Sequence, residues 1–439
     1  MKNKTPRGSI RRGLRVGGLG LRLVGSYLGY QVESLLLGGA SRQERRKDFH
    51  RRVSRRVREE LGMLKGAFMK FGQILSMQAQ ALPDEAIEEL TKLQMQAPGM
   101  HPTLARAQFK TSYGKYPEEV FREFDAEPFA AASLGQVHRA VTLGGAKAAV
   151  KIQYPAIRTA IENDFEILRT ATLPGRLTGH IPGSVLEEVE RGFLEETDYL
   201  NEGKNIDFLR RELKPFAYLT IPLVHWDLTT DRVLTMSYVE GETVRDFLAR
   251  KPSQELRNLI GERLLEMYLF QIQAVRALHA DPHPGNYLFD GHGRIGLVDF
   301  GCVTRFSEDL PEIFRWLIDG GRKQGDEHEK RMVRLLWGSP KFSRNTRTRQ
   351  MLRAVRDFYE MLYPPAGTRR ALVDFGDPAL LDGLTRNFKK ALRNKLANPE
   401  LIFAGRAELG LYNLLHQLGA KVNTREVWDR VMERSERRR

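Results

Sequence analysis

The pattern of hydrophobic and polar positions predicts helices at the start of the chain and strands after them. Apolar residues recur at helical spacing through 55–97, and a separate helix over 84–95 follows Pro83 and ends before Pro98. Short apolar runs with β-branched residues then predict strands, over 147–153, 219–225 and 232–239.

Helical periodicity returns in the second half. It predicts helices over 184–213 and 255–278, and a mostly helical region over 312–439 with loops at 338–348 and 363–370. Strands gathered in one part and helices in the rest indicate an α+β fold.

The stretch between the predicted helix 255–278 and the helical region 312–439 contains the candidate catalytic residues. It reads HADPHPGN over 279–286 and RIGLVDFG over 294–301. Two prolines and a glycine keep the first segment non-helical. Protein kinases use an acid, an amide five residues later and a second acid at a strand end to hold the attacking oxygen and Mg²⁺. We therefore predict that Asp281 orients or deprotonates the nucleophile, and that Asn286 and Asp299 bind the metal.

A purely structural alternative exists for this stretch, namely a β-hairpin with its turn at 290–293. The two interpretations are compatible, because such a hairpin would bring Asn286 and Asp299 side by side.

Two upstream segments match the kinase interpretation. Lys151 lies on the strand 147–153, which is similar to the Val-Ala-Ile-Lys strand of kinases. Kinases pair this lysine with a helix glutamate, for which Glu202 is our candidate, with Glu196 and Asp198 as further acids on the same helix. The alternative is that these acids lie on a solvated helix face.

The predicted nucleotide contacts come from a loop and a hinge. The loop occupies the place of a kinase glycine-rich loop, but alanines replace most of the glycines, so its backbone has fewer accessible conformations. Its candidate residues are Ala130, Ala131, Ala132, Ser133, Leu134, Gly135, Gln136 and Val137. The hinge, from Met236 through Tyr238 to Val239, would read the adenine edge with its backbone.

Charge and composition narrow the partners. The chain is +15 overall, but 1–58 holds sixteen Lys or Arg against three acids, so this segment alone is +13. The remainder is near neutral, and nucleic acid is not an expected partner. The basic and apolar N-terminus could contact an anionic membrane surface, or pack on the protein's own core. A single cysteine, no spanning segment and no signal peptide predict a cytoplasmic protein, at most peripheral on a membrane.

Several motifs together resemble the UbiB/AarF family of atypical kinases, over roughly residues 60–310. The distinguishing one is Lys70-Phe-Gly-Gln73, which stands for that family's Lys-x-Gly-Gln helix. The others are the alanine-rich loop, Lys151, Glu196-Thr-Asp198, Glu202 with Asn205, Asp281-Pro-His-Pro-Gly-Asn286 and Asp299-Phe-Gly.

The resemblance implies a two-lobed protein-kinase-like fold with an N-terminal helical extension and a mostly helical C-lobe. The extension would cover the site of a protein substrate, and its Lys70 and Gln73 would face the nucleotide and meet Glu196 or Asp198. The resemblance also implies ATP/ADP and Mg²⁺ as cofactors, and a link to ubiquinone-type isoprenoid lipids or quinone precursors. The alanine-rich loop then implies ADP binding and ATP hydrolysis rather than phosphorylation of proteins.

These inferences give four expected regions: the basic segment 1–58, a helical extension over 59–125, a kinase-like N-lobe over 126–240 and a helical C-lobe over 241–439. The favoured function is a UbiB-type ATPase or small-molecule kinase. The missing Ala-Pro-Glu after Gly301 argues against an ordinary protein kinase. The alternatives are an aminoglycoside-phosphotransferase-like kinase and a nucleotide-sensing membrane scaffold with little turnover.

Overall fold

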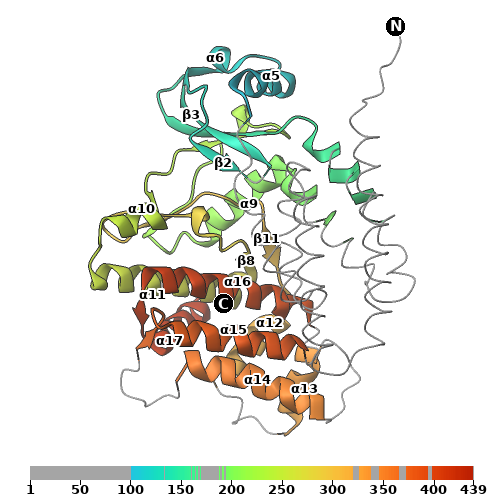
Figure 1. Ribbon diagram of the computed structural model, residues 1–439, viewed down its shortest axis with the longest axis vertical. Helices are drawn as coiled ribbons and strands as arrows, with labels where there is room; N and C mark the ends of the chain where they lie inside the picture. The colour runs from blue at the N-terminus through green and yellow to red at the C-terminus, as the bar shows by residue number, and fades with distance from the viewer. Residues whose placement is uncertain are drawn as a thin grey trace, which may run out of the picture. The chain divides into compact units, whose positions relative to one another are not determined.

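The computed structural model describes residues 100–439, apart from Ser133, most of 160–193, the short segments 320–325, 338–345, 365–371 and 394–397, and Arg439 (Figure 1). The predictions for 1–58 and for the helical extension up to residue 99, including Lys70 and Gln73, lie outside the described residues. The chain forms two compact units. The first takes 1–200 and 225–235, and the second takes 201–224 and 236–439.

The first unit is built on an antiparallel sheet. Its strands are β1 (Phe121–Phe124), β2 (Ala130–Ala132), β3 (Gly135–Thr142), β4 (Lys147–Gln153) and β6 (Val233–Ser237). They follow the order β1-β3-β4-β6, with β2 also paired to β3, and β6 continues into the second unit. The prediction of a strand over 147–153 is confirmed to the residue.

Two helices precede this sheet, α5 (Pro102–Tyr113) and α6 (Pro117–Val120). The sequence sets both ends of α5. Pro102 begins it, and Gly114 ends it with a φ of +83°, a left-handed conformation that favours glycine. Its buried Phe109 packs on the ring of Phe121, and both join the core that the buried strand residues Val150 and Ile152 form. The sheet is thereby covered by α5.

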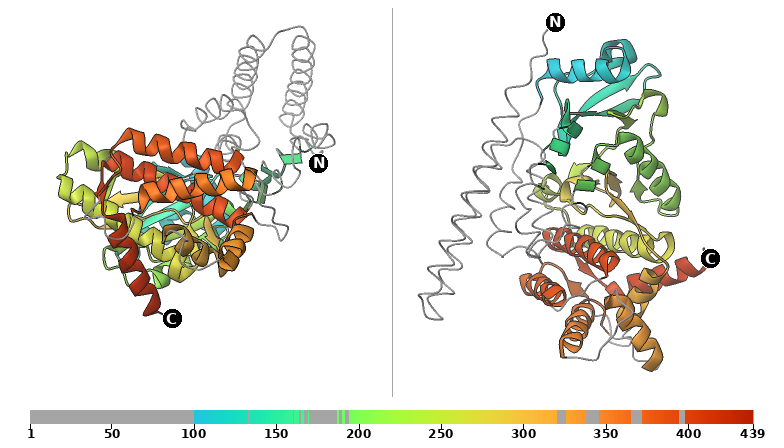
Figure 2. Two further views of the ribbon diagram at one scale, coloured as in Figure 1. Left: turned by 90° about the horizontal axis from the view of Figure 1, so that it is seen from below. Right: turned by 90° about the vertical axis from the view of Figure 1, so that its right-hand side faces the viewer.

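The second unit is mostly helical (Figure 2). Its helices are α9 (Tyr199–Glu212, which begins in the first unit), α10 (Val244–Ala249), α11 (Gln254–Phe270), α12 (Asp309–Ile318), α13 (Asp326–Trp337), α14 (Thr346–Leu362), α15 (Pro378–Arg393), α16 (Pro399–Leu418) and α17 (Thr424–Glu436). Helix α14 packs on α15, α15 on α16, and the central α11 on α16 and α17. None of the helices described here is both long and apolar enough to cross a membrane.

Short strands complete the second unit. One sheet has the order β5-β10-β9-β7, formed by β5 (Leu219–Thr220), β10 (Ile295–Leu297), β9 (Tyr287–Phe289) and β7 (Glu242–Thr243). A second pairs β8 (Ala277–His279) with β11 (Val303–Arg305), and a third pairs β12 (Val373–Asp374) with β13 (Lys421–Val422). The antiparallel β9–β10 pair confirms the predicted hairpin around 290–293.

Two predicted helices are wrong in their extent. The helix expected over 184–213 is broken at Thr197 and Asp198, and α9 begins only at Tyr199. The Thr197 side chain donates to the Leu194 carbonyl at 2.7 Å, while the Thr197 carbonyl accepts from the Gln153 side chain at 2.9 Å. These tertiary and local bonds replace the helical ones.

The helix expected over 255–278 ends at Phe270 and passes through a π-helical turn, Gln271–Val275. Arg276 then has a φ of +55°, and 277–279 form β8. The Gln271 side chain accepts a hydrogen bond from the His279 amide at 2.9 Å, which fixes this change of direction.

Candidate active site

The catalytic turn, defined here as residues 279–286, leaves β8 and leads into β9. Asp281 is half-buried and Asn286 is buried. The Asn286 side-chain amide donates to the Asp281 carboxylate at 3.0 Å and to the Asp281 backbone carbonyl at 3.1 Å. The His283 amide donates to the other carboxylate oxygen at 3.3 Å. The two residues predicted to work together are thus in direct contact, and Asp281 is held in place by its own turn.

The hairpin brings the second acid to the same place. Leu297 of β10 pairs with Tyr287 of β9, and the ladder continues as the Val298 amide donates to the Asn286 carbonyl at 3.2 Å. Asp299 follows directly, and its carboxylate accepts from the Gly301 amide at 3.0 Å. Asn286 and Asp299 therefore lie at one end of the same hairpin, as predicted from the turn at 290–293.

His279 joins the two ends of this site. Its Nε2 donates to the Asp299 backbone carbonyl, and its backbone amide donates to Gln271. The ring is buried and packs edge-on against Phe300, with ring centroids 5.6 Å apart. Sequence reasoning assigned no role to His279 or Gln271, although the position of His279 immediately before Ala280-Asp281 was a usable signal.

Glu202 and Asn205 hold the peptide of Phe300. The Phe300 amide donates to the Glu202 carboxylate at 3.3 Å, and the Asn205 side chain donates to the Phe300 carbonyl at 3.1 Å. Both residues are buried and lie three positions apart on α9, so they share one face. They fix the residue that follows Asp299.

The oxygen atoms of this site suit a hard cation. Because the Asn286 side-chain nitrogen donates to Asp281, the side-chain oxygen is the atom that could bind a cation. Amide and carboxylate oxygens are the ligands that Mg²⁺ prefers, together with phosphate oxygens. The residues present thus fit the predicted ion. No group of three or more His, Cys, Asp or Glu residues that could hold a metal ion occurs in the described part of the chain.

Charge and burial act on a neighbouring phenol. Burial raises the pKa of Tyr287, and the negative charge of Asp281 raises it further. Tyr287 is therefore a neutral hydrogen-bonding group at physiological pH.

The alanine-rich loop is a tight β-hairpin. Ala130, Ala131 and Ala132 of β2 pair with Val137, Gln136 and Gly135 of β3. Ser133 lies outside the described residues, and Leu134 is buried. A Cβ on Gly135 would come within 2.3 Å of the Ile152 carbonyl and 2.7 Å of the Tyr199 hydroxyl. Glycine is therefore required there for close backbone packing, a role different from that of a mobile phosphate loop.

Lys151 is held against an aromatic ring in the first unit. It is 5% exposed on β4, with its Nζ 5.1 Å from the centroid of the buried Tyr199 ring. In the same unit, Glu196 is half-buried and Asp198 is exposed directly before α9. The predicted Lys151–Glu202 pair involves one residue of each unit and stays a prediction.

The hinge segment belongs to the second unit. Met236 forms a β-bridge with Val224, and the Ser237 amide donates to the Leu223 carbonyl at 2.8 Å. Tyr238 is half-buried and Val239 is buried. The adenine contacts predicted for these residues stay a prediction, as does the nucleotide site that would combine them with the loop at 130–137.

A polar network in the first unit was not predicted. The Met100 amide donates to Gln136 at 2.7 Å, the Gln136 amide nitrogen lies 2.9 Å from the His138 Nε2, and the His138 Nδ1 donates to the Asp125 carbonyl at 2.8 Å. Burial lowers the pKa of His138, so the ring is neutral and its Nε2 accepts from Gln136. This network ties a residue of the alanine-rich loop to the beginning of the described chain.

Comparison with known proteins agrees with this geometry. The family model of the ABC1 atypical kinase-like domain matches residues 92–320, which is more than half of the chain. An Arabidopsis thaliana relative, the chloroplastic protein named Activity of BC1 Complex Kinase 7, is 34% identical over 60% of this chain and 39% of its own length. The mouse AarF domain-containing protein kinase 1 is 33% identical over 64% of this chain and 54% of its own length. The matches thus span only about half or less of these relatives.

A solved structure supports the fold. A Mycobacterium tuberculosis protein, Rv3197, solved in complex with erythromycin, superposes with a TM-score of 0.58 at 24% identity, covering 85% of this chain and 93% of the other. The predicted kinase-like α+β fold and the resemblance to the UbiB/AarF family are confirmed.

Proposed function

Because the chain belongs to the ABC1 (UbiB/AarF) family of atypical kinases, we propose that it binds a magnesium-bound adenine nucleotide and transfers its γ-phosphoryl group to water or to a small molecule. The observation that carries the proposal is the contact between Asn286 and Asp281 on the turn that the β9–β10 hairpin joins to Asp299. One compact segment thus offers a positioned acid and two oxygen ligands. Phosphoryl transfer depends mainly on such positioning and on charge neutralisation.

Each residue has a defined part in this proposal. Asp281, held by Asn286 and the His283 amide, accepts a hydrogen bond from the attacking hydroxyl or water and orients it. The oxygens of Asn286 and Asp299 would hold Mg²⁺, which when bound neutralises phosphate charge. Lys151 would contact the phosphates from its strand. His279, Glu202 and Asn205 keep the Asp299-Phe300 backbone in place.

We propose water or a small molecule as the acceptor, rather than a protein. Support comes from the family resemblance, from the absence of Ala-Pro-Glu after Gly301, and from the paired hairpin strands β2 and β3 of the alanine-rich loop. A link to isoprenoid lipids at a membrane surface is also part of the proposal. It is supported by the resemblance and by the +13 charge of 1–58.

The test is thermal unfolding of the full chain with ATP or ADP, with and without Mg²⁺. A ligand at 100 times its dissociation constant adds about 2.7 kcal/mol of stability. We expect a Mg²⁺-dependent rise in the melting temperature that Asp299→Asn weakens strongly. The matched control is Asp231→Asn, which neutralises an exposed acid of an exposed ion pair with Arg232 and should leave the rise intact. No rise with any nucleotide in the unmutated protein would refute the proposal.

A further inference from the structure

His283 stands between two prolines in the catalytic turn, and its side chain is exposed. Pro282 and Pro284 fix their own φ angles, and a residue before proline favours extended conformations, which His283 adopts with φ −60° and ψ 131°. Pro282 also lies against α16, where a Cβ on Gly410 would come within 2.1 Å of it. The backbone that carries the His283 ring therefore has little freedom.

One ring nitrogen of His283 is used inside the turn. The Gly285 amide donates to the His283 Nδ1 at 3.1 Å, so His283 caps the 3₁₀ turn Pro284–Asn286. Gly285 packs closely on the ring, because a Cβ there would come within 3.0 Å of Nδ1. A ring nitrogen that accepts carries no proton, and the proton of the neutral imidazole therefore lies on Nε2. The turn thus makes the His283 Nε2 a donor.

A cap alone would not require histidine at this position. Asn, Asp and Ser are the side chains that usually accept from an amide two residues further on, and they are smaller. Histidine adds a second polar atom, Nε2, at the far end of the ring. Within the part of the chain that the structure describes, the His283 Nε2 has no hydrogen-bond partner, and the exposed ring can present it to a ligand.

The other side-chain N–H groups of the catalytic turn are already used. His279 donates to the Asp299 carbonyl, and the Asn286 side chain donates twice to Asp281. The turn contains no lysine or arginine. His283 is therefore the residue of this turn whose side chain can donate to a bound anion.

His283 also lies next to the acid that is proposed to orient the nucleophile. Its backbone amide donates to the Asp281 carboxylate at 3.3 Å, so the ring is attached where that carboxylate is held. A phosphoryl group attacked by an oxygen at Asp281 approaches an acid of like charge. An N–H donor beside Asp281 offsets part of this repulsion and stabilises the oxygens on which charge accumulates.

We propose, on the basis of the nucleotide binding proposed above, that the Nε2–H of His283 donates to an oxygen of the γ-phosphate of bound ATP. The hydrogen bond forms with ATP and not with ADP, because ADP lacks this phosphate. His283 thereby strengthens the binding of ATP relative to ADP, and it holds the phosphoryl group beside the nucleophile that Asp281 orients.

Two substitutions separate the roles of the two ring nitrogens. His283→Asn keeps an acceptor near the position of Nδ1 and removes Nε2, whereas His283→Gln keeps a donor near the position of Nε2 and loses the capping acceptor. The probes are ADP and adenylyl imidodiphosphate, an ATP analogue with a non-hydrolysable imido bridge, each with Mg²⁺. Isothermal titration of the full chain measures both affinities. The matched control is His292→Asn, at an exposed histidine in the turn of the β9–β10 hairpin.

In His283→Asn we expect the affinity for the ATP analogue to fall about tenfold or more, the usual loss for a hydrogen bond to a charged group. The affinity of this variant for ADP should stay near that of the unmutated protein. His283→Gln should retain more of the affinity for the analogue, relative to ADP, than His283→Asn does. His292→Asn should change neither affinity.

A role in capping alone would weaken both nucleotides together or leave both unchanged. An equal change for the two nucleotides in His283→Asn, including no change, would therefore overturn the role of His283 and leave the proposed nucleotide binding intact. If circular dichroism shows that His283→Asn is unfolded, His283→Gln decides. A ratio of the two affinities close to that of the unmutated protein then supports the role, and a tenfold fall in the ratio overturns it. No binding of either nucleotide by the unmutated protein would refute the proposed function itself, and the role of His283 with it.

Discussion

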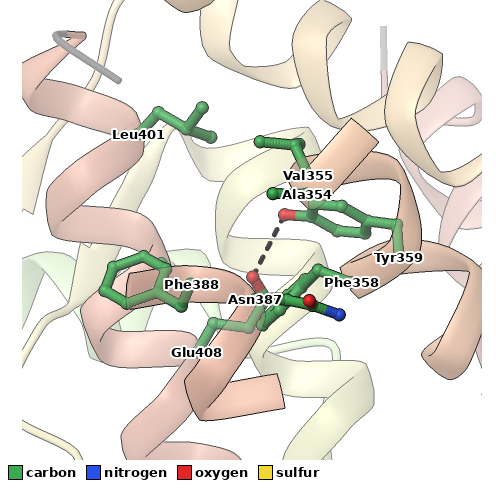
Figure 3. Close-up of a pocket in the computed structure, with 9 residues that line it drawn as sticks. Ala354, Val355, Phe358, Tyr359, Asn387, Phe388, Leu401 and Glu408 are labelled. Carbon is green, nitrogen blue, oxygen red and sulfur yellow. Dashed lines mark hydrogen bonds between the residues drawn. The ribbon is translucent and has the colours of Figure 1, made fainter. Parts of the chain in front are cut away.

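The catalytic turn and the Glu408 cluster, which is Glu408 with Tyr359 and Tyr412, each hold a carboxylate by two hydrogen bonds, but in opposite surroundings. Asp281 is half-buried and receives its bonds from Asn286 and from a backbone amide of the same turn. Glu408 is fully buried and receives its bonds from Tyr359 (Figure 3) and Tyr412, on two helices. In the turn, local sequence orients an acid that reagents can reach. In the cluster, tertiary packing orients an acid that solvent does not reach.

This difference predicts that changes at the turn alter rates, whereas changes in the cluster alter stability. The largest effect is expected for Asp281→Asn, which keeps the shape and removes the base. Its rate of ATP turnover should fall by a factor of about 10²–10⁴, the usual contribution of a positioned acid–base group. Its melting temperature and its nucleotide-induced shift should stay close to those of the unmutated protein.

The measurement is steady-state ATP hydrolysis combined with thermal unfolding. Asp309→Asn, at the half-buried start of α12, is the control, and it should leave turnover unchanged. An Asp281→Asn protein with full turnover would contradict the role of the turn. The nucleotide-sensing scaffold would then be the better description if Asp299→Asn still abolished cellular function.

The second prediction concerns the pH dependence that Glu408 gives to stability. Its pKa is about 7 in the folded chain, against an ordinary value of 4.5, so the folded state binds more protons between these pH values. The free energy of unfolding should therefore fall as pH rises from about 4.5 to 7, and then level off, with a total contribution of about 3 kcal/mol.

Urea unfolding between pH 5 and 8 measures this contribution, by comparison of the unmutated protein with Glu408→Gln. The variant has no group that titrates at this position, so its stability should decline less over this interval. Parallel curves for the two proteins would show that burial does not raise the pKa of Glu408, and the contrast with Asp281 would disappear.

The same contrast explains how much of each region could be predicted from the sequence. The hairpin, the strand at 147–153 and the Asp281–Asn286 contact were predictable because neighbouring residues determine them. The break at Thr197 was not, because the Gln153 side chain, 44 positions away, takes the Thr197 carbonyl. No role was predicted for Glu408. The sequence signal for Glu408 was the largely apolar helix Pro399–Leu418. Such a helix has no polar face, so a glutamate within it must be buried.

One helix touches both regions and allows a third test. Gly410 lies on α16 two positions after Glu408, and hence on nearly the opposite face. A Cβ at Gly410 would come within 2.1 Å of Pro282 in the catalytic turn. Gly410→Ala should therefore displace Pro282, destabilise the fold by about 1–3 kcal/mol and lower turnover.

Gly383→Ala on α15 is the matched control. Its Cβ would meet the flexible end of Met361 at 2.6 Å, so the neighbour can move away. Turnover and urea unfolding of the two variants should differ, with only Gly410→Ala slowing ATP hydrolysis. If both retain full turnover, then the close packing of α16 on Pro282 has no part in positioning Asp281.

The smallest effect is expected in the first unit. There the Gln136 network tests whether a buried series of hydrogen bonds affects both stability and nucleotide binding. Gln136→Leu leaves the Met100 amide and the His138 Nε2 without their partner and should cost about 1–3 kcal/mol. Burial lowers the pKa of His138 in the folded protein, so as pH falls the unfolded chain protonates this imidazole first. The free energy of unfolding should therefore decrease as pH falls below about 6.5. Urea unfolding at pH 7.5 and 5.5 measures both effects.

His138→Gln separates the two effects, since it should remove the His138 part of the loss at low pH while keeping an acceptor for Gln136. If Gln136→Leu leaves the unfolding midpoint and the ADP-induced thermal shift unchanged, the network only fills space. If it weakens the ADP shift as well as the stability, then the alanine-rich hairpin depends on a buried polar chain for its function, as the catalytic turn depends on Asn286.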